Sequence, residues 1–186
     1  MIILIMNSAM LFFFIYMNRI LCLFLAEVYE SWKRIRGRHF TFHSKVHVLL
    51  QTLRQHYKIA LITNGPSQAQ WEKIAHLKAA ELFDAIVVSG DLAYEKPQAE
   101  IFHLACRKLQ VRPDKCVMVG DRFETDIIGG QSAGLAASIW IPLNSTYNCQ
   151  EASSLSLPVI TISHLAELYS LFGIFMDDCE APIYQN

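Results

Sequence analysis

Hydrophobic and polar positions alternate in two different rhythms along most of this chain. Within residues 45–56, apolar side chains recur three and four positions apart, which predicts an amphipathic helix built on Val46, Leu49, Leu50 and Leu53. Residues 58–63 are a short apolar run that is followed by Asn64-Gly65-Pro66. Such a run is typical of a buried strand that ends in a turn.

The same alternation repeats toward the C-terminus. Further helices are predicted at residues 67–80, 97–109, 125–133 and 164–172, and further strands at residues 84–89, 115–119, 136–141 and 159–162. Gly134 suits the position after a helix end, and Ser163 suits an N-cap. Strands and helices at this spacing predict an α/β fold, a Rossmann-like three-layer core with a parallel sheet. We expect this core over residues 46–173, with a tail at 174–186.

The first 26 residues are strongly apolar and contain a single charged residue, Arg19. Three interpretations are open: a transmembrane helix, a signal peptide, or a segment foreign to the fold. A membrane span needs about 20 apolar residues, and a basic cluster after the segment would keep that side cytoplasmic (Lys33, Arg34, Arg36, Arg38). No charged region precedes the apolar run, which argues against a signal peptide. We favour the third interpretation.

Composition and charge exclude several classes of protein. The chain is 53% hydrophobic and 18% charged, which argues against disorder. Its net charge of −1 argues against a basic protein that binds nucleic acid. The five cysteines form no C-x-x-C pair, so neither a disulfide framework nor a zinc site is indicated. This cysteine usage fits a reducing compartment, and we expect a cytoplasmic location.

Two of the predicted strands are followed by groups that can bind phosphate. The first is followed by Thr63, Asn64 and Gly65, a hydroxyl and backbone N–H groups in a turn that leads into a helix. The second is followed by Lys96, which lies just before a helix and can act as a point charge toward phosphate oxygens. Ordinary turn chemistry and an ordinary surface lysine are the alternatives.

A third strand ends in Gly120 and is followed by two carboxylates, Asp121 and Asp126. Acidic side chains at a strand end with no obvious basic partner suit Mg²⁺, which prefers oxygen ligands and phosphates. Helix capping by Thr125 or Asp126 is the alternative. Ligands of parallel sheets bind at the carboxyl ends of the strands, so the three strand ends together predict a site for phosphate and magnesium.

These motifs resemble those of the haloacid dehalogenase-like (HAD) hydrolase superfamily. Residues 61–65 look like its second motif, residues 96–97 its third, and residues 120–126 its fourth, GDxxxxD. The likeness covers residues 46–172 and is nearest to the branch of N-acylneuraminate-9-phosphatase-like proteins. It implies magnesium-dependent hydrolysis of a small phosphorylated metabolite, such as a sugar acid phosphate. In that scheme Thr63, Asn64 and Gly65 bind the phosphate, Lys96 neutralises its charge, Asp121 contacts the metal and Asp126 supports it.

The sequence departs from the family pattern at the first motif, DxDxT, which in the family supplies the nucleophile and the acid. The first aspartate of these 186 residues is Asp84. We therefore expect the first core strand and the mobile cap to be missing or replaced, with residues 27–45 a remnant of the cap or a linker. The apolar residues 2–6 are a candidate to fill the slot of the missing strand. Magnesium should bind weakly without the first-motif aspartates.

Three functions remain open on the sequence. The first is a HAD-like phosphatase that is impaired because its nucleophile is absent. The second is a catalytically silent module that binds a phosphate or a partner. The third is a HAD-like protein anchored in a membrane by residues 1–26, with its core on the cytoplasmic side.

Overall fold

The computed structural model of the chain describes residues 23–31, 34–35, 41–142 and 158–173. Clustering of contacts divides the chain into two compact units, Met1–Thr41 and Phe42–Asn186. In the first unit, residues 23–31 are helical and several apolar side chains are exposed, among them Leu23 and Phe24. The strand proposed for residues 2–6, most of the apolar segment 1–26 and the tail at 174–186 lie outside the described residues. No helix in the described ranges has both the length and the apolarity to cross a bilayer.

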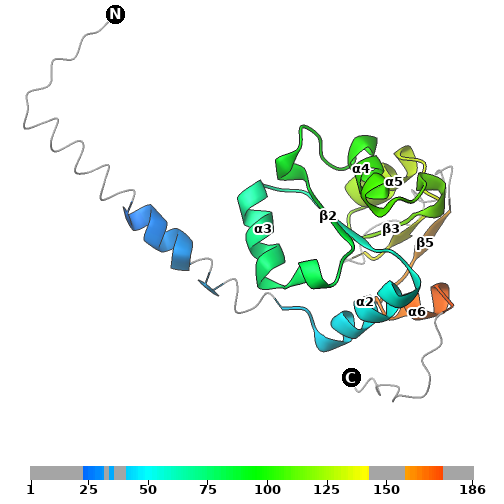
Figure 1. Cartoon of the computed structure of the whole chain (residues 1–186), viewed down its shortest axis with the longest axis horizontal. Helices are drawn as coiled ribbons and strands as arrows, with labels where there is room; N and C mark the ends of the chain where they lie inside the picture. The colour runs from blue at the N-terminus through cyan, green and yellow to red at the C-terminus, as the bar shows by residue number, and fades with distance from the viewer. Residues whose placement is uncertain (1–22, 32–33, 36–40, 143–157, 174–186) are drawn as a thin grey trace, which may run out of the picture. The chain divides into compact units, whose positions relative to one another are not determined.

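The second unit has the predicted alternation of strands and helices (Figure 1). Its parallel strands are β1 (Ala60–Thr63), β2 (Ala85–Val88), β3 (Val117–Gly120), β4 (Ala137–Trp140) and β5 (Val159–Thr161). Its α-helices are α2 (Ser44–His56), α3 (Ser67–His76), α4 (Ala99–Leu109), α5 (Ile128–Ser132) and α6 (Glu167–Leu171). Short turns of other helix types are η1 (Ala79–Glu81), η2 (Ser89–Asp91), η3 (Pro113–Lys115) and η4 (Phe123–Ile127).

Some predicted helix boundaries were wrong. Helix α3 ends at His76 because Lys78 adopts a left-handed conformation, with φ of 50°, before η1 begins. The helix predicted at 125–133 begins instead with the π-type turn η4 and continues as α5. Gly134 does follow that helix with φ of +69°, as predicted.

Ser163 is not the N-cap of α6, whose N-cap is Ala166. The bonding runs in the opposite direction, because the carboxylate of Glu167 accepts hydrogen bonds from the N–H groups of Ser163 and His164. The donors that precede the helix are thereby satisfied by a side chain from its first turn.

The strands form two sheets, not one. Strand β1 pairs with β2, and β3, β4 and β5 form a second sheet in that order. In the described part of the chain, no strand is hydrogen-bonded between β1 and β3. Val117 on the edge strand β3 is accordingly 38% exposed. This break lies where the sequence predicts a missing first strand.

Helices cover both faces of the strands and bridge the break. On one face, α4 packs against β1, β2 and α5, and its Ile101 and Phe102 are buried in a cluster that Ile62 and Met118 border. On the other face, Leu49 and Leu53 of α2 pack with Ile139, Ile162 and Leu168. Alternate residues of a strand face opposite layers, so this arrangement gives the three-layer core that the sequence predicts.

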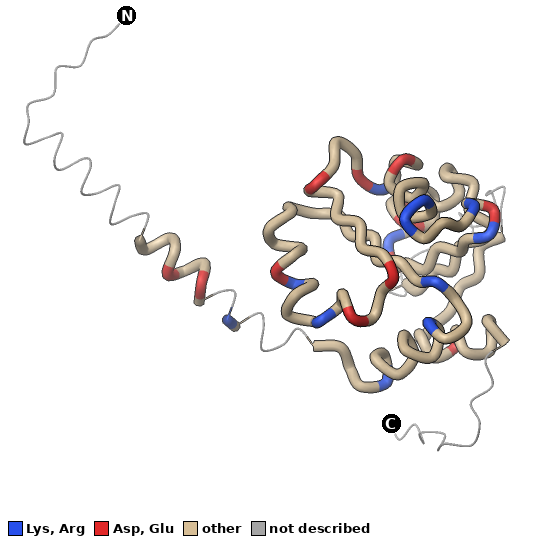
Figure 2. The backbone as a smooth tube through the Cα atoms, viewed as in Figure 1, with Lys and Arg blue, Asp and Glu red and all other residues tan. Residues whose placement is uncertain are grey.

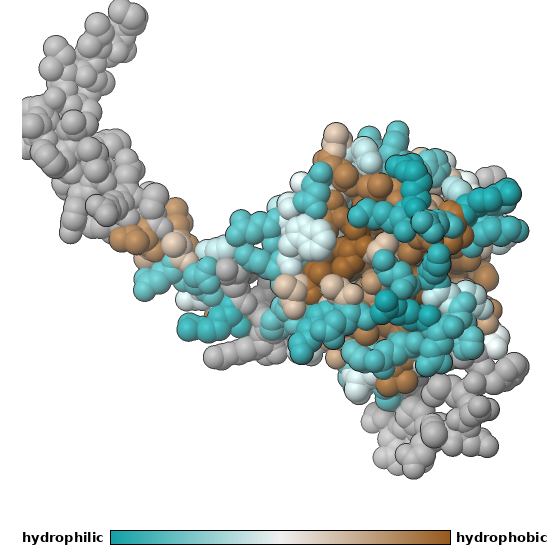
Figure 3. Space-filling view, in the orientation of Figure 1, coloured by the Kyte–Doolittle hydropathy of each residue, from teal (hydrophilic) through white to brown (hydrophobic). Residues whose placement is uncertain are grey.

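The surface of the second unit is mixed in character. Lysines and arginines are interspersed with aspartates and glutamates along the backbone (Figure 2). On the face that Figure 3 shows, hydrophilic residues surround apolar atoms at the centre. Among the residues that the structure describes, charges of both signs are interspersed and form no extended basic surface.

Candidate functional site

The turn after β1 is held tightly against η2. Gly65 has φ of +134°, a conformation that L side chains rarely adopt, and its N–H donates a 3.0 Å hydrogen bond to Ser89 Oγ. On the other side of this contact, a Cβ on Gly90 would overlap the backbone of Ser67. The two glycines therefore let the backbones of two loops approach each other.

A second contact between these loops is made by side chains. The carboxylate of Asp91 accepts hydrogen bonds from Ser67 Oγ and from Trp71 Nε1, the latter at 2.8 Å. Both bonds favour the ionised carboxylate and lower the pKa of Asp91, the Ser67 bond more strongly. Trp71 is 42% exposed and lies at the rim of this turn.

Gln70 on α3 forms hydrogen bonds with the turn that follows β1. Its side chain is buried, and its Nε2 donates a 3.0 Å hydrogen bond to the carbonyl oxygen of Asn64. Since that carbonyl can only accept, Gln70 Oε1 must face Thr63 Oγ1, which lies 3.2 Å away and donates to it. Gln70 was not among the predicted site residues, because glutamine on a predicted helix is usually a surface residue.

The backbone of Lys96 is hydrogen-bonded to the same turn. Asn64 Nδ2 donates to the Lys96 carbonyl at 2.9 Å, and the Lys96 N–H donates to Asn64 Oδ1 at 3.1 Å. The Lys96–Pro97 peptide bond is cis. Lys96 Nζ donates to the carbonyl oxygen of Ile62, 3.1 Å away on β1. The lysine that follows β2 thus reaches back over the end of β1.

Asp126 has a basic partner, contrary to expectation. Its Oδ1 lies 2.7 Å from Lys96 Nζ, and the side chains of Lys96 and Asp126 are only 11% and 4% exposed. Its Oδ2 accepts from the Arg122 N–H at 3.1 Å, and Thr125 Oγ1 lies 3.4 Å from Oδ1. Both oxygens of Asp126 are therefore already occupied within the protein.

Gly120 makes room for this ion pair. A Cβ on Gly120 would overlap the side chain of Asp126, so the end of β3 must be glycine for the carboxylate to lie there. Because Lys96 contacts both Ile62 on β1 and Asp126 beside Gly120, the carboxyl ends of β1 and β3 meet at one place. Parallel strands bind ligands at such an edge.

Asp121 is exposed, unlike Asp126. Its carbonyl oxygen accepts a 3.0 Å hydrogen bond from Trp140 Nε1, and the ring of the buried Trp140 stands edge-on to Phe123, with 5.0 Å between centroids. The aromatic pair and this hydrogen bond hold the acidic loop, residues 121–126, in place. Asp121 is therefore held at the end of β3 and is exposed to solvent.

The donor set suits a metal held partly by other molecules. No group of three or more His, Cys, Asp or Glu side chains that could hold an ion is present among the described residues. Asp126 is bound to a lysine, whereas Asp121 is an exposed carboxylate at the same strand end. Mg²⁺ commonly binds through one or two carboxylates together with phosphate oxygens and water. The residues present fit that mode and do not form a complete protein cage.

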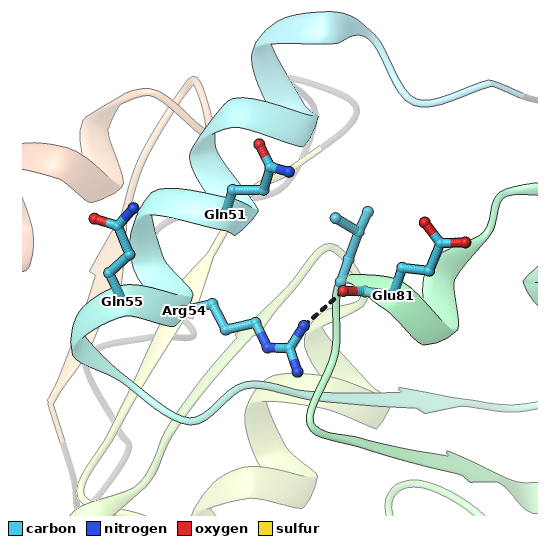
Figure 4. Close-up of a pocket in the computed structure, with 5 residues that line it drawn as sticks. Gln51, Arg54, Gln55 and Glu81 are labelled. Carbon is cyan, nitrogen blue, oxygen red and sulfur yellow. Dashed lines mark hydrogen bonds between the residues drawn. The ribbon is translucent and has the colours of Figure 1, made fainter.

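A surface depression lies elsewhere on the unit, between α2 and η1 (Figure 4). Gln51, Arg54, Gln55, Glu81 and Leu82 line it. Arg54 donates there to the carbonyl oxygen of Glu81 and pairs with Asp84 at 2.9 Å. None of these residues belongs to the strand-end network, so the depression is separate from the candidate site.

The chain is similar to known hydrolases over most of its length. A family model described as haloacid dehalogenase-like hydrolase matches residues 30–134. N-acylneuraminate-9-phosphatase of Homo sapiens is 41% identical over 157 residues, which are 84% of this chain and 61% of that protein. Glyceraldehyde 3-phosphate phosphatase of Methanothermobacter thermautotrophicus is 35% identical over 96 residues, 52% of this chain and 42% of the relative. The chain thus spans about three fifths of the first relative's length.

Solved structures lead to the same family. A HAD-hydrolase from Bacillus subtilis, solved bound to magnesium, superposes with a TM-score of 0.66 and 27% sequence identity. The superposition covers 78% of this chain and 62% of the other. The match of the family model, the similar relatives and the shared fold show that this chain belongs to the haloacid dehalogenase-like hydrolase family.

Proposed function

We propose that this chain binds the phosphate group of a small phosphomonoester at the junction of β1 and β3, with Mg²⁺ at Asp121. The observation that carries the proposal is the position of the Lys96 ammonium, which lies between the β1 turn and the acidic loop. N-acylneuraminate 9-phosphate is the first substrate to test, because a relative named for its hydrolysis is 41% identical.

Lys96 retains capacity for an anion. An ammonium has three N–H donors, and in the described structure Lys96 uses one toward Ile62 and one toward Asp126. The third can be donated to a phosphate oxygen, as can the backbone N–H of Asn64. Hydrogen bonds to charged groups contribute about 1.5–3 kcal/mol each. A few such contacts account for binding in the millimolar to micromolar range.

Asp121 would hold the magnesium ion. When bound there, the ion supplies positive charge that offsets the charge of the phosphoryl oxygens. Asp126 has a different task in this proposal. It pairs with Lys96, orients the ammonium and keeps the buried charge compensated.

Turnover by these 186 residues should be slow. The sequence contains no aspartate before Asp84, and Asp84 is occupied by Arg54 and the Ile59 N–H, away from the strand-end network. No described side chain is therefore placed to act as the family's nucleophile. We propose an impaired phosphatase, and the alternative with the same site is a silent phosphate-binding module.

Titration calorimetry with inorganic phosphate, with and without Mg²⁺, tests the site directly. Lys96→Met should weaken phosphate binding at least tenfold, whereas Lys108→Met, at an exposed position of α4, should leave it unchanged. Since Lys96→Met alone leaves Asp126 unpaired, the double variant Lys96→Met/Asp126→Asn provides a second comparison. Equal affinity in all four proteins would refute the site.

Hydrolysis assays separate the two remaining alternatives. Slow release of phosphate from N-acylneuraminate 9-phosphate that requires Mg²⁺ and is lost in Asp121→Asn would support an impaired phosphatase. Phosphate binding without any release would support the silent module. Rapid release that is insensitive to Asp121→Asn would contradict both.

A further inference from the structure

We infer that two side-chain amides, those of Asn64 and Gln70, are positioning residues that hold the oxyanion-binding groups in place. Asn64 acts on the backbone of Lys96, and Gln70 acts on the hydroxyl of Thr63. We refer to these two side chains as the amide brace. The inference rests on the proposed function, since it concerns the same site.

Both polar atoms of the Asn64 side chain form hydrogen bonds with Lys96. The Lys96 N–H can only donate and its carbonyl can only accept, so Asn64 Oδ1 must face the first and Nδ2 the second. The paired bonds, 3.1 and 2.9 Å long, fix the amide in one orientation. One Nδ2 proton and Oδ1 are used by Lys96, so the Asn64 side chain retains its second Nδ2 proton, and the residue's backbone N–H is a further donor for an anion.

These two bonds determine where the lysine ammonium lies. They join the backbone of Lys96 to the residue that follows Thr63, and its Nζ bonds Ile62 on the same strand. Lys96 is therefore attached to the end of β1 at both its backbone and its tip. Without the Asn64 side chain, the backbone of Lys96 would lose both of these hydrogen bonds to the turn that follows β1.

Gln70 controls the direction of the Thr63 hydroxyl. A hydroxyl has one proton, and Thr63 donates it to Gln70 Oε1. To donate to an incoming phosphate oxygen, the hydroxyl must turn away from Gln70. Gln70 is held for this role by its bond to the Asn64 carbonyl and by its close packing on Gly65, where a Cβ would overlap its amide. The two amides thus form one connected network.

Amide hydrogen exchange tests Asn64 in the protein without ligand. Asn64→Ala should speed exchange of the Lys96 N–H about tenfold or more, because that N–H loses its acceptor. Gln68→Ala is the matched control, since Gln68 is an exposed amide of α3 that bonds Glu72. Exchange in β4 and β5 should not change in either variant. Unchanged exchange at Lys96 in Asn64→Ala would overturn the role of Asn64.

Phosphate affinity tests whether each amide acts through its partner. Gln70→Met should strengthen phosphate binding about threefold to tenfold in the natural background, because the Thr63 hydroxyl no longer gives up its bond to Gln70 in order to donate to phosphate. It should have no further effect in a Thr63→Val background, where the hydroxyl is absent. A merely structural role would weaken binding by the same factor in both backgrounds. The same cycle with Asn64→Ala and Lys96→Met should also be non-additive.

The outcomes distinguish the inference from the proposed function. Absence of phosphate binding by the unsubstituted chain would refute the proposed function, while faster exchange at Lys96 in Asn64→Ala would still support the brace. Phosphate binding together with additive cycles and unchanged exchange would refute the brace and leave the proposed function standing.

Discussion

The Lys96 ammonium and the Asp126 carboxylate form a 2.7 Å ion pair that connects the two sheets of the core. Lys96 also bonds Ile62 on β1, and Asp126 follows β3, so the pair spans the break between these strands. Breaking a buried pair by removing one partner commonly destabilises a protein by about 3–5 kcal/mol, because a charge is left uncompensated. We expect Lys96→Met and Asp126→Asn each to lower the free energy of unfolding, the first by about 3 kcal/mol.

Urea unfolding of both single variants and the double variant checks this expectation. The double variant should be less destabilised than the sum of the single variants, because it leaves no charge unpaired. Strictly additive losses would show that the two side chains do not interact in solution.

Gly120→Ala should disturb the same ion pair without removing either charge. The added Cβ would overlap Asp126, so the carboxylate must move away from Lys96. We expect a loss of about 2 kcal/mol in the free energy of unfolding, within the range for strained or overpacked positions, and weaker phosphate binding. Gly134→Ala is the comparison, because its Cβ would meet no atom within 4 Å and only its φ of +69° is unfavourable. Gly134→Ala should cost about 1 kcal/mol and leave phosphate binding intact.

Ser138→Ala should leave the protein equally stable or stabilise it. Ser138 Oγ is buried on β4, 1% exposed at the residue level, and has no hydrogen-bond partner in the described structure. An unsatisfied buried hydroxyl costs about 1–3 kcal/mol, which alanine would relieve. Thermal and urea unfolding measure the change. The control is Ser132→Ala at an exposed position, which should change the free energy of unfolding by less than about 0.5 kcal/mol. A destabilisation of Ser138→Ala above about 1 kcal/mol would mean that the hydroxyl has a partner.

Asp84 makes stability depend on pH in the acid range. Its pKa is lowered, chiefly by the 2.9 Å hydrogen bond from the Ile59 N–H and also by Arg54. A carboxyl with a depressed pKa in the folded state stabilises the protein above its unfolded pKa of about 3.9. That contribution is lost as the pH falls through the folded pKa. Asp84→Asn should lower stability at pH 7 by about 1 kcal/mol or less.

The same substitution should reduce the slope of unfolding free energy against pH below about pH 4. Urea titrations at several pH values between neutral and acid conditions measure that slope. If the slopes of the natural chain and of Asp84→Asn coincide, Asp84 does not contribute to the acid sensitivity.

Cys116 should react slowly with alkylating reagents. Burial, and then the neighbouring thiol of Cys106 at 3.6 Å between sulfurs, raises the pKa of Cys116 to about 12. Because the thiolate is the reactive form, alkylation by iodoacetamide at pH 8 should be on the order of a thousandfold slower than for a free thiol. Peptide mass spectrometry reports the rate at Cys116, and unfolding in urea should abolish the difference. Rapid labelling of the folded protein would show that the thiol is not protected.

The sequence alone predicted the α/β fold well, and the predicted site residues Thr63 and Gly120 are the last residues of β1 and β3. Parallel strands place their carboxyl ends at one edge, so Thr63, Lys96 and Asp121 could be assigned to one place from strand positions alone. The pairing of Lys96 with Asp126 could not be predicted, because it depends on side-chain directions in loops that are far apart in the sequence. Gln70 was missed for a related reason. Its neighbours on α3 are a half-exposed tryptophan and a charged residue, and no pattern marks a glutamine that turns inward.

The break between β1 and β3 has a mechanical consequence. In the described residues, the two sheets share no strand ladder, and packed helices such as α4 are what resist their sliding past each other. The Lys96 ammonium bonds to residues of both sheets. A displacement of about 1 Å between the sheets would therefore separate it from either Ile62 or Asp126. The affinity of the strand-end site for an anion should therefore depend on how well the two sheets are aligned.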